Sequence, residues 1–239
     1  MDIDYLRQLA IFNPKHFENK SVTVVGAGAT GSCVTLMLAQ MGIKNLKVWD
    51  HDVVEEHNLP NQMFFISHIG IAKVDALKEV IKLKCGFEIE THKERVVDQK
   101  ITSNYIFILT DTMSSRKEIF QKCIKGKSFN TDLVIETRMD ADNGRIYAFN
   151  PNLPSHIREW EATLYEDKEA AVSVCGASVS IMPTVSILAG MAVWKLIHHF
   201  DVEYGPNNTK KNNKEEELYH ECIFQLGPED ILTRRFKQL

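Results

Sequence analysis

Short apolar runs alternate with longer stretches of helical spacing along the first half of the chain. The runs are rich in β-branched residues, which is typical of strands buried on both faces of a sheet. Because strands and helices alternate, we expect a parallel sheet with right-handed crossovers. The predicted strands are Val22–Gly26, Asn45–Asp50, Glu88–Val97 and Asn104–Thr110, and the predicted helices are Gly31–Met41, Ile71–Lys84 and Ser114–Lys125.

The pattern changes in the second half of the chain. Leu133–Met139 and Gly144–Asn150 flank a short polar turn, which predicts an antiparallel hairpin. Glu221–Leu226 is predicted to be a final edge strand. The fold class is therefore α/β: a Rossmann-like, doubly wound mixed sheet with a parallel N-terminal half and an antiparallel C-terminal half.

Four further segments complete the predicted domain, which we expect to be a single unit over 1–239. Ile3–Ile11 has the spacing of a short amphipathic helix, and Asn152–Ser173 is predicted to be a loop that crosses the sheet. Val179–Ile197 is apolar but contains proline, glycine and lysine, so a buried helix is favoured over a membrane span. A mobile insertion is expected at about 205–217, because these residues are almost all polar.

Composition narrows the possible classes of partner. The net charge is −4 and no basic stripe stands out, so we expect no nucleic-acid partner and no membrane partner. The five cysteines are scattered without a C-x-x-C pair, which disfavours a zinc ribbon or a disulfide framework. The chain begins with acidic residues and no apolar leader, and the expected location is cytoplasmic.

A glycine-rich turn follows the first predicted strand. Gly26, Gly28 and Gly31 allow the tight turn and the close approach of phosphates to the main chain, and the helix that begins near Ala29 directs its amide groups at them. Asp50 follows the next strand, where a carboxylate binds a ribose hydroxyl. The sequence therefore predicts a nucleotide site.

Further polar residues follow this turn in a distinctive order. Residues 50–62 read DHDVVEEHNLPNQ, residues 70–74 read GIAKV, and residues 110–116 read TDTMSSR. The chain resembles the ThiF/MoeB/HesA family, whose corresponding loop reads approximately D-x-D-x-V-x-x-x-N-L-x-R-Q. The resemblance extends from about Arg7 to Phe200, and the ordered set is more specific than any single motif.

The resemblance implies ATP-dependent adenylation of the C-terminal carboxylate of a small ubiquitin-like or sulfur-carrier protein or a peptide, with release of pyrophosphate. Both reactants are anions, so the site has to neutralise charge. It also implies a homodimer, in which an arginine of one subunit reaches the ATP of the other. The implied catalytic residues are Arg7, Lys73, Asp111 as the Mg²⁺ ligand, and Cys175 as a nucleophile; the implied ATP-binding residues are Gly26, Gly28, Ala29, Gly31, Asp50, Asp52, Asn58, Asn61, Gln62 and Lys73.

The chain departs from the family pattern in two places. Asn61 stands where most members have arginine, and Arg138 is a possible substitute for that cation. The zinc-binding C-x-x-C pairs of many members are absent, which indicates a compact, divergent member. Arg116 has two interpretations, a phosphate contact or a surface ion pair with Asp111 or Glu118.

Three other functions stay open. A nicotinamide- or flavin-dependent oxidoreductase uses the same glycine turn but gives Lys73 and Asp111 no role. A nucleotide-binding scaffold for a partner protein agrees with the loss of a cation at Asn61. Adenylation of a modified tRNA nucleoside is disfavoured by the lack of a basic patch.

Overall fold

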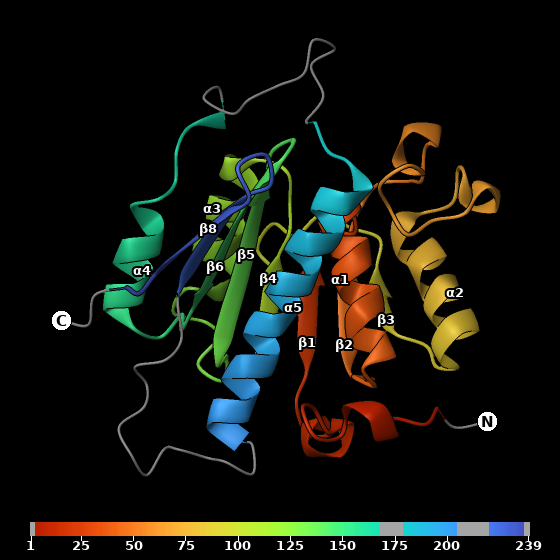
Figure 1. Cartoon of the computed structure of the whole chain (residues 1–239), viewed down its shortest axis with the longest axis horizontal. Helices are drawn as coiled ribbons and strands as arrows, with labels where there is room; N and C mark the ends of the chain where they lie inside the picture. Colours follow the sequence, from red (N-terminus) through yellow and green to blue (C-terminus); the bar gives the residue numbers. More distant parts are fainter. Residues whose placement is uncertain (1–2, 168–178, 205–219, 237–239) are drawn as a thin grey trace.

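The computed structural model describes residues 3–167, 179–204 and 220–236, and within them eight strands form one mixed sheet (Figure 1). The strands are β1 (Val22–Val25), β2 (Leu46–Trp49), β3 (Glu90–His92), β4 (Tyr105–Ile108), β5 (Leu133–Met139), β6 (Asn143–Phe149), β7 (Glu221–Gln225) and β8 (Asp230–Arg234). Their order is β3-β2-β1-β4-β5-β6-β7-β8. Pairing is parallel from β3 to β5 and antiparallel from β5 to β8, so the predicted mixed sheet is confirmed.

Helices cover both faces of the sheet, because the buried strands present apolar side chains on each side. The helices are α1 (Ala29–Gln40), α2 (Lys73–Cys85), α3 (Met113–Ile119), α4 (Pro154–Glu161) and α5 (Met182–Tyr204). Phe107 and Ile135 point into one apolar cluster with α1, α2 and α5. Ile106 and Val134, their neighbours in sequence, point into a second cluster with α3 and α4.

The N-terminal segment is not the predicted amphipathic helix. It forms two 3-10 turns, η1 (Leu6–Gln8) and η2 (Pro14–Phe17). Leu6 is 73% exposed and Leu9 is 41% exposed, so little of the described chain covers these two apolar positions. A helix of this length depends on tertiary packing, which is missing here.

Two predictions in the second half of the chain are wrong. The expected crossing loop contains α4, which begins with Pro154 and buries Trp160 against β6 and α3. The strand expected at the edge is internal, because β8 pairs with β7 through all five of its residues. The insertion expected at about 205–217 lies outside the described residues.

The long apolar helix α5 packs against α1, β5 and β6, as predicted for a buried helix. Among the described helices, none combines the length and the apolar character needed to cross a bilayer.

Candidate active site

The glycine turn between β1 and α1 is required by packing at two of its glycines. Gly26 has φ +101°, and a Cβ there would lie 2.6 Å from the carbonyl oxygen of Leu109. A Cβ on Gly31 would lie 1.8 Å from the carbonyl oxygen of Gly26. Gly28 differs, because a Cβ built on it meets no described atom within 4 Å beyond its own chain neighbours. The turn therefore leaves free space beside Gly28, at the start of α1, which has no side-chain cap.

Asp50 holds this turn in place from the end of β2. One carboxylate oxygen accepts a hydrogen bond from the amide of Ala27 at 2.6 Å, and the other accepts from the amide of Asp52 at 2.8 Å. The carboxylate is partly exposed and lies at the carboxyl edge of the parallel strands. In an open α/β sheet, that edge is where ligands bind.

Lys73 begins α2 and points its ammonium group at Asp52. The Nζ lies 2.9 Å from the Asp52 carboxylate, and the Lys73 side chain is buried while that of Asp52 is half exposed. Burial acts to raise the pKa of Asp52, but the hydrogen bond and the charge of Lys73 outweigh it and lower that pKa. The site thus contains a buried cation whose partner faces solvent.

The polar residues of the loop after Asp52 have different roles. Asn58 is buried, and its side-chain oxygen accepts from the amide of Glu55, so it stabilises the loop itself. Asn61 donates from Nδ2 to the hydroxyl of Ser180 at 2.5 Å. Asn61 Oδ1 and Gln62 Oε1 are buried acceptors without a hydrogen-bond partner among the described residues. Such oxygens suit a ligand that donates hydrogen bonds.

Asp111 follows β4 at the same edge of the sheet, and its side chain is exposed. Within the described parts of the chain, no hydrogen bond or ion pair engages its carboxylate. Asp111 is therefore a carboxylate at this edge that is open to a hard cation such as Mg²⁺. Asp50, His51 and Asp52 also place possible ligand atoms within 4.8 Å of one another, although Asp50 and Asp52 already accept from main-chain amides and Lys73.

Arg116 is not on the surface, and the predicted ion pair with Asp111 or Glu118 is wrong. Its guanidinium is buried, and Nε lies 2.9 Å from Glu136 of β5. Arg138 is buried as well and binds the same carboxylate, so it does not replace the cation missing at Asn61. The sequence analysis did not identify Glu136 as part of a buried charged cluster. The pattern that indicates such a cluster is two charged residues, Glu136 and Arg138, on one face of an otherwise apolar strand.

The N-terminal segment that contains η1 lies at the opposite edge of the sheet from the start of α1 (Figure 1), and Arg7 is in η1. Gln8 donates a hydrogen bond to the carbonyl of Met41, and the ring of Tyr5 lies against Gly42, just after the end of α1. The 12 residues of α1 separate this point from the turn by about 18 Å. The fold of one chain therefore does not bring Arg7 to the glycine turn.

The predicted nucleophile Cys175 lies outside the described residues. The four described cysteines are buried and free of disulfides. Burial raises the pKa of Cys33 to about 11, so this thiol in α1 is an unreactive core residue.

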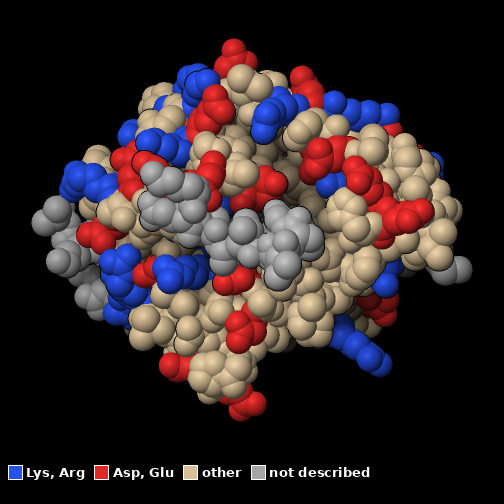
Figure 2. All heavy atoms as spheres, turned by 90° about the horizontal axis from the view of Figure 1, so that it is seen from above, with Lys and Arg blue, Asp and Glu red and all other residues tan. Residues whose placement is uncertain are grey.

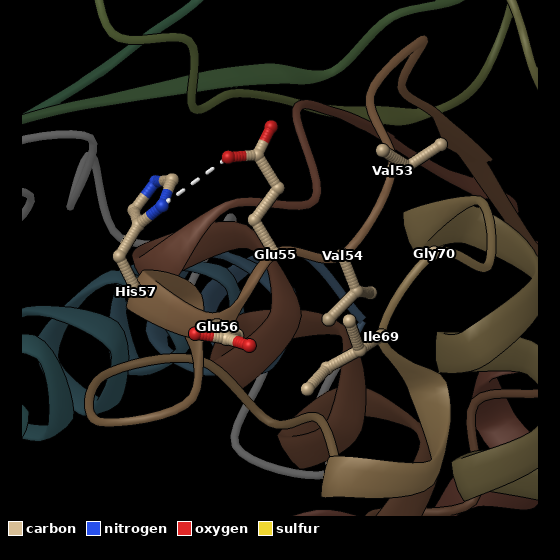
Figure 3. A pocket seen from close by; sticks show the side chains of 7 residues that line it. All are labelled: Val53, Val54, Glu55, Glu56, His57, Ile69 and Gly70. Atoms are coloured by element: carbon tan, nitrogen blue, oxygen red, sulfur yellow. Dashed lines mark ion pairs between the residues drawn. The ribbon is translucent and has the colours of Figure 1, made fainter.

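A hollow of about 770 Å³ lies in the loop between β2 and α2 (Figure 3). It is lined by Val53, Val54, Glu55, Glu56, His57, Ile69 and Gly70. Its two glutamates make it unsuitable for a phosphate, and His57 is paired with Glu55 at 3.3 Å. Figure 2 views the molecule from the carboxyl edge, where acidic and basic side chains are interspersed.

The sequence of the chain is similar to those of known proteins. The model of the ThiF family matches residues 5–225. The adenylyltransferase and sulfurtransferase MOCS3 of Culex quinquefasciatus is 28% identical over 126 residues, which are 50% of this chain and 29% of that protein. The NEDD8-activating enzyme E1 catalytic subunit of Arabidopsis thaliana is 36% identical over 104 residues, which are 41% of this chain and 23% of that protein.

Solved structures show the same fold at low identity. E. coli MccB, crystallised with AMPCPP and MccA, has a TM-score of 0.67 and 14% identity, over 95% of this chain and 66% of MccB. PaaA has a TM-score of 0.66 and 19% identity, over 95% of this chain and 67% of PaaA. The chain spans less than a third of the length of the two curated relatives, yet the family match covers nearly all of it. The chain therefore belongs to the ThiF family.

Proposed function

We propose that this chain binds ATP and adenylates the C-terminal carboxylate of a small ubiquitin-like or sulfur-carrier protein or of a peptide, acting as a homodimer. The observation that carries the proposal is the arrangement at the carboxyl edge of the sheet. Open space beside Gly28, a buried cation at Lys73 and a free carboxylate at Asp111 lie around one turn.

The reaction joins two anions. A carboxylate oxygen attacks the α-phosphorus of ATP, the new bond gives an acyl-adenylate, and the bond to the β-phosphate breaks to release pyrophosphate. In this proposal the amides at the start of α1 and the Lys73 ammonium offset the charge of the phosphates. Asp50 accepts from the ribose, and the unpartnered oxygens of Asn61 and Gln62 accept from other hydroxyl or amino groups of the nucleotide.

Magnesium is the proposed metal, and Asp111 is its proposed ligand. A free, exposed carboxylate fits an ion that keeps most of its water and shares phosphate oxygens. When bound, Mg²⁺ supplies positive charge to the phosphates. The protein's own part is to hold the carboxylate in place at the end of β4.

The proposed dimer explains how Arg7 takes part. Arg7 is exposed and makes no hydrogen bond or ion pair among the described residues, so its guanidinium is available to another subunit. Apolar side chains around it are exposed as well, as expected for a segment that packs on a second copy: Ile3, Leu6, Leu9 and Ile11. Arg7 is therefore proposed to reach the ATP of the partner.

Mixing two inactive variants tests this arrangement. In a mixture of Arg7→Ala and Asp111→Ala subunits, heterodimers contain one site with both residues intact. Exchange of pyrophosphate into ATP should partly recover relative to either variant alone. No recovery, despite subunit exchange shown by differently tagged chains, would contradict the donation of Arg7 in trans.

The class of substrate rests on the names of relatives. Several are named as activating enzymes for ubiquitin-like modifiers, and MccB was crystallised with MccA. We propose that the C-terminal tail of the substrate ends in glycine and that Cys175, which lies outside the described residues, receives the activated acyl group.

An ATP–pyrophosphate exchange screen tests the function directly. The chain is incubated with small proteins ending in Gly-Gly and with peptides that have free C-termini, beside a Lys73→Ala control. Exchange that depends on one carboxylate and is lost in the control supports the proposal. Tight ATP binding without exchange for any candidate would instead support the scaffold function, which is favoured by Asn61 because this residue binds Ser180 and offers no cation.

A further inference from the structure

Three charged side chains are buried together between β5, α3 and α4. Glu136 is 0% exposed, Arg138 is 5% exposed and Arg116 is 6% exposed. Glu136 and Arg138 are two residues apart on β5, so both point to the face covered by α3 and α4. Arg116 reaches them from α3.

Glu136 forms ion pairs with both arginines, and Arg138 Nε donates to both of its carboxylate oxygens, at 3.2 and 3.0 Å. Its Oε1 lies 2.9 Å from Arg116 Nε, and its Oε2 lies 3.0 Å from Arg138 Nη2. The indole NH of Trp160 also donates to Oε2 at 3.3 Å. The carboxylate is thus fully enclosed by donors from three elements.

The terminal nitrogens of Arg138 bind the chain just beyond α4. Nη1 and Nη2 donate to the carbonyl and hydroxyl oxygens of Thr163, just beyond α4, at 2.7 and 2.9 Å. The guanidinium carbon lies 4.3 Å from the ring centre of Tyr147. Arg138 therefore joins β5 to the chain that follows α4.

Arg116 makes contacts of a different kind, because they reach the loop that carries Asp111. Nη2 donates to the carbonyl of Thr137 at 3.1 Å, and Nη1 donates to the carbonyl of Asp111 at 3.4 Å. The same loop is held from its other side by Asp167, which accepts from the amides of Met113 and Ser114. The main chain at Asp111 is thus fixed while its carboxylate stays free.

Stability alone does not explain this cluster. Burying three charges is costly, and well-packed apolar side chains are often equally stable in their place. The forked guanidinium of Arg116 offers something that an apolar side chain lacks, namely an ion pair with a carboxylate together with hydrogen bonds to two main-chain carbonyls. We propose that Arg116, held by Glu136, is a positioning residue that sets the place of the Asp111 carboxylate at the nucleotide edge.

The test rests on the proposed function and uses three variants in pyrophosphate exchange. Arg116→Lys keeps the charge beside Glu136 but loses the fork, and Glu136→Gln keeps the shape but releases the guanidinium. Thr163→Val is the matched control, because it removes a hydrogen bond of Arg138 in the same cluster without touching the path to Asp111.

We expect Arg116→Lys and Glu136→Gln to lower kcat by up to about 100-fold, as small misplacements of a reacting group do, and to raise the Mg²⁺ concentration needed. KM for ATP should stay unchanged, because Lys73 and the glycine turn are not disturbed. Thr163→Val should keep the kcat of the unmodified chain even where it lowers the unfolding temperature.

Normal kcat and Mg²⁺ dependence in a folded Arg116→Lys variant would overturn the inference, and so would a loss equal to that in Thr163→Val. If Glu136→Gln does not fold, Arg116→Lys decides the question. Absence of exchange in the unmodified chain is a separate result: it refutes the proposed function, and this inference with it.

Discussion

Replacing Gly28 with alanine separates nucleotide binding from the folding of the glycine turn. The backbone at Gly28 is extended, with φ −74° and ψ −150°, so alanine fits without strain. Its Cβ meets no described atom within 4 Å beyond its chain neighbours. In the absence of nucleotide, Gly28→Ala should therefore be as stable as the unmodified chain, or more stable by about 0.4–1 kcal/mol.

The loss of ATP affinity is expected to be large. The added methyl group fills the space through which phosphates approach the amides at the start of α1. Loss of two hydrogen bonds to a charged group, each contributing about 1.5–3 kcal/mol, weakens binding roughly 100- to 10,000-fold. Isothermal titration with ATP·Mg²⁺ measures this directly, and thermal unfolding without nucleotide measures the stability.

Gly31→Ala is the matched control. Its Cβ would lie 1.8 Å from the carbonyl oxygen of Gly26, so the turn itself has to move, at a cost of about 1–3 kcal/mol or more. This variant should lose both stability and ATP binding. If Gly28→Ala binds ATP as tightly as the unmodified chain, the phosphates do not lie on this turn, and the reasoning fails.

Three further predictions concern single residues. Burial, together with neighbouring positive charge, lowers the pKa of His220 to about 4. The free energy of unfolding should therefore fall by about 3 kcal/mol as the pH drops from about 6.5 to about 4. His220→Asn keeps an acceptor for the amide of Phe236, and its free energy of unfolding, measured by chemical denaturation, should change less over this pH range. The folded pKa of Asp52 lies below its unfolded value of about 3.9, so the stability from its pair with Lys73 is present above that pH and lost below it. Asp52→Asn should accordingly lower the unfolding temperature at pH 7 and have no effect near pH 2. Cys175→Ser should abolish any thiol-sensitive conjugate between the chain and its substrate on a non-reducing gel.

Local sequence rules succeeded where a residue type is required by the main chain. Gly26 and Gly31 allow no side chain, and the apolar run around Phe107 has the length of a strand buried on both faces. The alternation of strands and helices predicted the parallel half of the sheet, and the hairpin pattern predicted the antiparallel half. These features therefore predicted the parallel half of the sheet correctly, and the nucleotide site at its carboxyl edge stays a prediction.

The errors arose where tertiary contacts decide the structure. Leu6 and Leu9 have helical spacing, but both are exposed in the part of the chain that the structure describes, and only 3-10 turns form. Helix α4 was overlooked because one large apolar residue, Trp160, anchors it, although Pro154 marks its start. The cluster at Glu136 was hidden because its members come from segments about 20 residues apart.

A crystal structure with Mg²⁺ and a non-hydrolysable ATP analogue tests the central claim most directly. The account predicts the phosphates beside Gly28, with the Lys73 ammonium and the Asp111 carboxylate at the polyphosphate and Arg7 contributed by a second copy. A nucleotide bound elsewhere, or bound by a single copy with Lys73 and Asp111 distant from the phosphates, would contradict it.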